Sequence, residues 1–122
     1  MMILVPVRTV SEANQRGHWS ARARRAKGQR EAARLMVLSA IRGATFSAGR
    51  FALTLTRIAP RHLDSDNLAA ALKAVRDGVA DALRLDDGDP RLTWEYAQAK
   101  GKKGEYAVLV LLSFTPENTK GG

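Results

Sequence analysis

The segment from Tyr106 to Phe114 constrains the fold more than any other part of the chain. Its apolar side chains stand at successive positions, so the β-strand that it predicts is apolar on both faces. Such a strand belongs in the middle of a sheet, because a strand with one face in water alternates between apolar and polar residues. We therefore expect a β-sheet with this segment at its centre.

Three further strands are expected. Residues 2–7 are apolar but include Pro6, which has no N–H to donate, so this strand lies at an edge of the sheet or ends there. Residues 51–58 alternate as a half-buried strand does. Residues 92–96 alternate as well, and residues 100–104 read as a turn, which predicts that the last two strands form a hairpin.

Two helices separate these strands. The first is expected to begin near Ser20, a suitable N-cap, and to run to about Arg42, with Gly43 at the C-cap. The second is expected over residues 67–83, where apolar residues recur at steps of three and four. This apolar stripe consists of Leu68, Leu72, Val75, Val79 and Leu83.

The elements thus follow one another in the order β-α-β-α-β-β. A short mixed sheet with two helices packed on one face would bury the apolar stripes. The sequence therefore predicts a single small α+β domain over residues 1–114, followed by a flexible C-terminal tail over residues 115–122.

Charge narrows the class of partner. The chain has 20 Lys and Arg against 12 Asp and Glu, a formal charge of +8, which favours a polyanion. It has no cysteine, which excludes thiolate metal sites and disulfides. No stretch approaches the length of a membrane span, and the apolar start is too short for a signal peptide. We expect a soluble, cytoplasmic protein.

The basic residues are concentrated in two places, the first predicted helix with its approach and the turn before the last strand. Contacts from such groups to nucleic-acid phosphates would depend on salt and not on base sequence. The alternative is a solvated basic face. A membrane surface is disfavoured, because the apolar side of residues 20–34 is mostly alanine. The candidate nucleic-acid-binding residues are Arg16, Arg22, Arg25, Lys27, Arg30, Arg34, Lys100, Lys102 and Lys103.

Seven of the 12 acidic residues lie between Asp64 and Asp89. Asp64 and Asp66 stand two apart before a predicted helix, and two carboxylates ~4 Å apart repel by about 4 kcal/mol at an effective dielectric of ~20. A hard cation such as Mg²⁺, or alternatively Mn²⁺, would offset this repulsion. The alternative is that these acids cap the helix and form turns.

The motif at residues 64–68 (DSDNL), a helix bearing Lys73, and the segment 82–87 (ALRLDD) together carry a resemblance. They resemble the RusA-type Holliday junction resolvases, in which Asp-x-Asp-Asn-Leu is followed by a helical lysine and, about one helix later, by an Asp-Asp pair. One position departs from that pattern: the family's lysine falls at Ala70, and Lys73 lies three residues further on.

The resemblance implies a homodimeric, Mg²⁺-dependent crossover junction endodeoxyribonuclease that acts on branched DNA without an organic cofactor. It implies that Asp64, Asp66 and Asp87 bind the metal and are catalytic, with Lys73 assisting and Asp86 as a lesser candidate. Lys73 has an alternative interpretation as an exposed partner of Asp77. Two other functions remain open. One is a binding module for branched DNA or RNA without cleavage, and the other is a basic assembly or RNA-associated protein.

Overall fold

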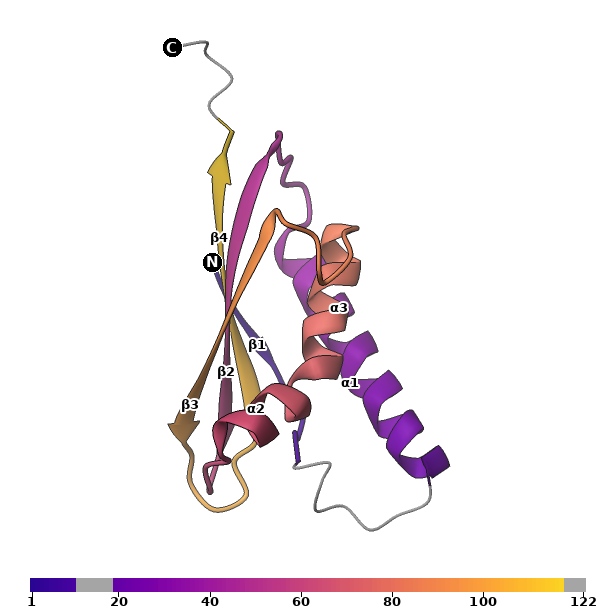
Figure 1. The fold of residues 1–122 in the computed structure, drawn as a ribbon, viewed down its shortest axis with the longest axis vertical. Helices are drawn as coiled ribbons and strands as arrows, with labels where there is room; N and C mark the ends of the chain where they lie inside the picture. The colour runs from indigo at the N-terminus through magenta and orange to yellow at the C-terminus, as the bar shows by residue number, and fades with distance from the viewer. Residues whose placement is uncertain (11–18, 118–122) are drawn as a thin grey trace.

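A computed structural model describes residues 1–10 and 19–117. Its four strands form one sheet, and the helices lie together on one face of it (Figure 1). The predicted α+β fold with a mixed sheet is confirmed, with one helix more than expected. The elements are β1 (Met2–Val5), α1 (Trp19–Ala40), β2 (Gly49–Ala59), α2 (Ser65–Ala71), α3 (Lys73–Leu83), β3 (Leu92–Lys100) and β4 (Ala107–Pro116).

The strand order in the sheet is β1-β4-β2-β3. The central position predicted for the last strand is confirmed, because β4 pairs antiparallel with both β1 and β2. The edge position predicted for the first strand is confirmed as well. Residues 115–116 extend β4 and pair with β2, so any tail begins later in the chain than predicted.

The predicted hairpin between the last two strands is wrong. β3 pairs in parallel with β2, and β2 separates it from β4. The helices α2 and α3 form the crossover that a parallel pair of strands requires. The loop after β3 then passes the end of β2, where Gly101 N donates to the carbonyl oxygen of Ala59 at 2.8 Å.

The core lies between the sheet and the helices. The stripe predicted for the second helix is largely buried, with Leu72, Val75 and Val79 fully enclosed. The single helix predicted over residues 67–83 is nevertheless two, because the backbone leaves helical geometry at Leu72 (φ −95°, ψ −1°). No glycine or proline causes this break. It comes with the complete burial of the Leu72 side chain in the core.

The helices α1 and α3 approach each other most tightly at Gly78. A Cβ there would collide with the carbonyl oxygen of Arg30 and lie 2.8 Å from the Cβ of Ala33. The missing side chain therefore permits the backbones to come close. This contact sets the distance between the basic helix α1 and the helix that bears Lys73.

Candidate nucleic-acid interface

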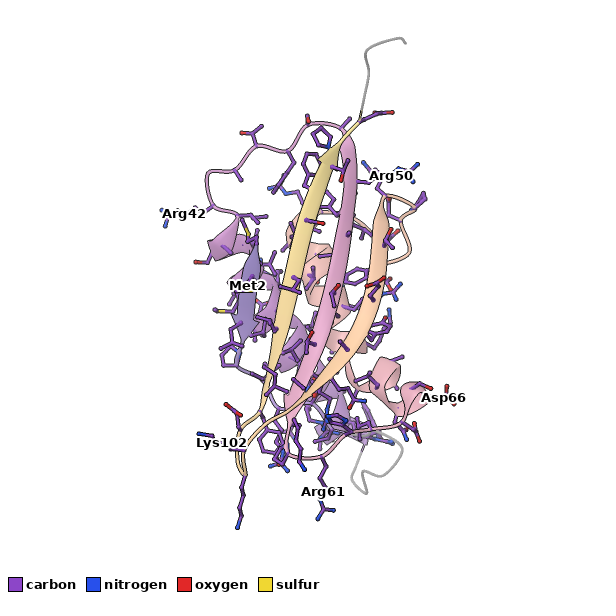
Figure 2. The ribbon with its side chains drawn as sticks, turned by 90° about the vertical axis from the view of Figure 1, so that its left-hand side faces the viewer. Met2, Arg42, Arg50, Arg61, Asp66 and Lys102 are labelled. Atoms are coloured by element: carbon purple, nitrogen blue, oxygen red, sulfur yellow. The ribbon has the colours of Figure 1, made fainter. Side chains whose placement is uncertain are left out.

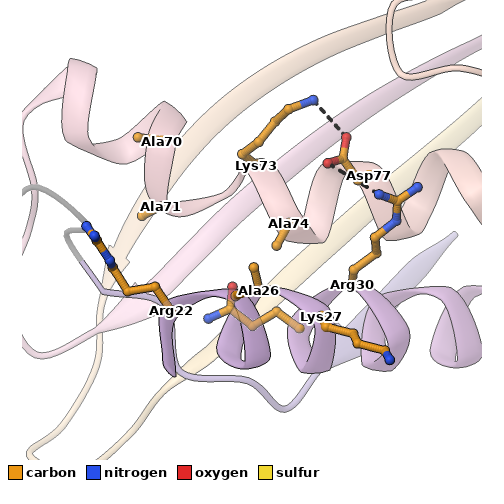
Figure 3. A pocket seen from close by; sticks show the side chains of 11 residues that line it. Arg22, Ala26, Lys27, Arg30, Ala70, Ala71, Lys73, Ala74 and Asp77 are labelled. Carbon is orange, nitrogen blue, oxygen red and sulfur yellow. Dashed lines mark hydrogen bonds and ion pairs between the residues drawn. The ribbon is translucent and has the colours of Figure 1, made fainter. Parts of the chain in front are cut away.

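A cavity of about 620 Å³ lies between α1 and the helices α2 and α3, and we call it the α1–α3 groove. Alanines form its floor, and Ala26 of α1 faces Ala74 of α3 across it (Figure 3). Alanine has no atoms beyond Cβ, so these positions leave space between the helices. Four cationic side chains and one carboxylate also line the groove: Arg22, Lys27, Arg30, Lys73 and Asp77.

The basic residues predicted on α1 contribute to the groove, although two of them, Arg30 and Arg34, are paired within the protein. Arg30 forms a bidentate ion pair with Asp81 of α3, in which Nε lies 2.6 Å from Oδ2 and Nη2 lies 2.9 Å from Oδ1. These hydrogen bonds raise the pKa of Arg30 and lower that of Asp81. Arg34 is paired with Glu31 on its own helix. Arg30 therefore joins the two helices as well as lining the groove.

The other predicted nucleic-acid contacts are distributed differently. Arg25 lies on α1 outside the lining of the groove. Arg16 falls outside the described residues. The lysines at the end of β3 and in the loop that follows it are exposed, and Lys102 lies far from Asp66 in Figure 2. These are Lys100, Lys102 and Lys103.

The acidic motif begins as a helix cap. Asp64 is the N-cap of α2: its Oδ1 accepts a hydrogen bond from Asn67 N at 2.9 Å, and its Oδ2 accepts one from Asn67 Nδ2 at 3.1 Å. The preceding residue, Leu63, exchanges two backbone hydrogen bonds with the side-chain amide of Gln98 on β3. Asp66 lies exposed in the first turn of α2. The capping interpretation of Asp64 is thus confirmed.

Asp87 is held beside α3 by two cations. Lys73 Nζ lies 2.7 Å from Asp87 Oδ2, and Arg76 Nε lies 3.0 Å from the same oxygen. The backbone carbonyl of Asp87 accepts further hydrogen bonds from Arg76 Nη2 at 3.0 Å and Trp94 Nε1 at 2.8 Å. The hydrogen bond from Lys73 lowers the pKa of Asp87. The loop after α3 is therefore fixed to the helix and to β3.

Lys73 also pairs with Asp77 at 2.8 Å, as the spacing of four residues predicted. Hydrogen bonds to Asp77 and Asp87 raise the pKa of Lys73. The sequence did not identify Arg76, which stacks over Trp94 with its guanidinium carbon 4.8 Å from the ring centroid. Its spacing of three residues from Lys73, on the same face of α3, is the signal that could have found it.

A magnesium site can be tested against these contacts. Within residues 1–10 and 19–117, no group of three or more His, Asp or Glu side chains stands together as metal ligands. Lys73 and Arg76 supply positive charge where a cation bound to Asp87 would supply it. Both oxygens of Asp64 already accept from Asn67. In this arrangement the residues do not fit a three-carboxylate site, and the metal-binding role of Asp64, Asp66 and Asp87 stays a prediction.

Comparison with known proteins assigns no family. No protein-family model matches the chain, and no curated protein matches it. The likeness to RusA-type resolvases therefore rests on residues 64–68, Lys73 and residues 82–87. Among the described helices, none is both long enough and apolar enough to cross a membrane.

Proposed function

We propose that the protein binds branched DNA along the α1–α3 groove and cleaves it as a metal-dependent endonuclease, with Mg²⁺ or Mn²⁺ as the ion. The main observation in support of the proposal is the position of the groove relative to α2 and Asp87. Its cationic rim adjoins α2, the helix that begins at the acidic motif, and Lys73 connects it to Asp87. A phosphate backbone in the groove would therefore meet Lys73, the partner of Asp87, and Ala70 of α2, which lies four residues after Asp66.

The cations of the groove suit a backbone contact. Arg22 and Lys27 have exposed positions on α1, where a phosphate oxygen can reach them. Such contacts neutralise phosphates and release counterions, so affinity should fall steeply with salt. They are indifferent to base sequence, which suits recognition of DNA shape. A four-way junction has two-fold symmetry, and a C2 homodimer would match it.

The sequence motif is the reason to propose a metal ion. The ion pairs of Asp87 with Lys73 and Arg76 would compete with metal binding at that carboxylate. We therefore assign no reaction step to an ion. Cleavage is the hydrolysis of one phosphodiester bond in each of two strands, and its dependence on Asp64, Asp66 and Asp87 is the testable content of the proposal.

The test is incision of a synthetic four-way junction in Mg²⁺ and in Mn²⁺, with a linear duplex of the same sequence beside it. Asp66→Asn should reduce the rate by about 100-fold or more, if Asp66 is a metal ligand. Asp66 is exposed, so this change leaves the core untouched. Glu95→Gln is the matched control, because it removes one carboxylate from the sheet face that the helices leave uncovered. No incision by the wild type in either metal, or full activity in Asp66→Asn, would overturn the proposal.

A second candidate function is a module that binds branched DNA or RNA without cutting it. The specific observation in its favour is that internal partners already engage the carboxylates of Asp64 and Asp87. Retarded migration of the junction in a gel, without incision in either metal, selects this function. Equal retardation of the linear duplex would remove the preference for branched DNA from both candidates.

A further inference from the structure

The guanidinium of Arg57 is buried without a carboxylate partner. Arg57 lies on the inner face of β2, and only 6% of its surface is exposed. Its Nε donates to Thr9 Oγ1 at 3.0 Å, its Nη2 to the carbonyl oxygen of Thr9 at 3.3 Å, and its Nη1 to that of Arg61 at 2.6 Å. All three acceptors are neutral. Within the described parts of the chain, no acidic residue forms an ion pair with it.

A buried charge is costly unless an anion compensates it. The effect is visible in the chain itself, since burial lowers the pKa of Arg57. A guanidinium has five N–H donors, and the three hydrogen bonds leave two of them without a partner in the described chain. Neutral oxygens thus position the group, but they do not neutralise it.

Arg57 also lines a cavity of about 250 Å³. Two more arginines line it, Arg8 from the segment after β1 and Arg61 from the segment after β2. Arg8 lies over the ring of Tyr106, with its guanidinium carbon 4.3 Å from the ring centroid. Among the residues that the structure describes, no acidic one lines the cavity. Its volume admits a phosphate group, which has five heavy atoms, together with several waters of about 30 Å³ each.

We propose that Arg8, Arg57 and Arg61 form a binding site for one phosphate group, either a phosphodiester of nucleic acid or free phosphate. Arginine binds phosphate oxygens with paired N–H donors, and a guanidinium held in place loses little freedom on binding. Arg57 would bind the anion with a buried guanidinium that is held in place. The exposed side chains of Arg8 and Arg61 would bind the same anion. The site shares no lining residue with the α1–α3 groove, and phosphate binding there does not require that the protein cleaves DNA.

The competing explanation is purely structural. The hydrogen bonds of Arg57 tie the segment after β1 to the segment after β2, and that link alone would explain why Arg57 is buried. It predicts that Arg8 and Arg61 can be replaced without changing any response to phosphate. The double variant Arg8→Gln with Arg61→Gln separates the two explanations, because both side chains are exposed and their replacement leaves the hydrogen-bond acceptors of Arg57 in place.

The first measurement is thermal unfolding in phosphate and in chloride at equal ionic strength, without divalent metal. For a dissociation constant on the order of 1 mM, a tenfold excess of phosphate should raise the melting temperature by about 6 °C. The control variant Arg42→Gln with Arg50→Gln removes the same charge at the opposite end of the sheet from Arg61 (Figure 2). The control should keep the rise, and the Arg8/Arg61 variant should lose most of it. No rise in the wild type, or an equal rise in both variants, overturns the site.

The second measurement identifies the source of the phosphate. Affinity for branched DNA is measured against salt concentration, again without divalent metal. Each lost phosphate contact should reduce the slope of log K against log[salt] by about 1. A smaller slope in the Arg8/Arg61 variant than in the control assigns the site to the nucleic-acid backbone. An unchanged slope, with the thermal response lost, assigns it to free phosphate. Failure of the wild type to cut DNA would leave both results intact.

Discussion

The contact between α1 and α3 at Gly78 yields the sharpest prediction about stability. In Gly78→Ala the new Cβ collides with the carbonyl oxygen of Arg30 and lies 2.8 Å from Ala33 Cβ. One of these neighbours is backbone and the other is a Cβ, so no rotamer change can relieve the crowding. The helices must move apart.

The magnitude follows from two opposing effects. Overpacking a helix contact costs about 1–3 kcal/mol, and a collision with backbone belongs at the upper end. Alanine gains about 1 kcal/mol over glycine inside a helix. The net expectation for Gly78→Ala is a loss of about 2 kcal/mol in the free energy of unfolding, or roughly 8 °C in melting temperature.

Gly28→Ala in the middle of α1 is the matched control. Nothing lies within 4 Å of a Cβ built at Gly28, so the same substitution keeps its helix gain and meets no clash. It should stabilise the protein by up to about 1 kcal/mol. Urea and thermal unfolding of both variants measure the difference. If Gly78→Ala proves as stable as Gly28→Ala, the close approach of α1 and α3 is wrong, and with it the width of the α1–α3 groove.

Three further predictions concern the charged residues near α2 and α3. Asp64→Ala should destabilise the protein by about 1 kcal/mol through loss of the N-cap, whereas Asp64→Ser should keep the cap; equal melting temperatures for the two variants would contradict the capping role. Lys73→Ala should remove one of the two cations that contact Asp87 Oδ2 and leave Arg76 in place, so that Mg²⁺ raises the melting temperature more in the variant than in the wild type; an unchanged response would mean that Lys73 does not compete with a cation. Asp89 has its pKa lowered from 3.8 to about 2 by hydrogen bonds from Arg91, so its contribution is present above pH ~4 and is lost as the pH falls toward 2. Unfolding measured across that range should lose part of its pH dependence in Asp89→Asn, and an identical profile would show that the pair is not formed in solution.

The contacts of Asp87 bear directly on the choice between the two candidate functions. Lys73 and Arg76 both meet its Oδ2, and this pairing is compatible with binding of nucleic acid in the absence of an ion. A cation that binds Asp87 would have to compete with them. The Lys73→Ala measurement therefore tests cation binding at Asp87 through stability, and the junction assay tests the acidic motif at Asp66 through incision.

Much of the local structure follows from the sequence. The apolar run over residues 106–112 placed the last strand in the centre of the sheet, and Pro6 placed the first at its edge. The cap at Asp64 and the pairing of Lys73 with Asp77 also follow from spacing, because their partners lie within four residues along the chain. Hydrophobic periodicity and short-range hydrogen bonds need no knowledge of the remaining fold.

The tertiary structure decided what joins segments distant in the chain. The sequence predicts that β3 pairs with β4. In the structure β3 pairs with β2, because the crossover through α2 and α3 places it beside that strand. Arg57 occupies one position of an alternating strand, and only its contacts with Thr9 and Arg61 show that its charge is buried. Periodicity assigns a residue to a face of its own element. Which charges then meet across elements depends on strand order and helix spacing, and these are settled only when the whole core packs.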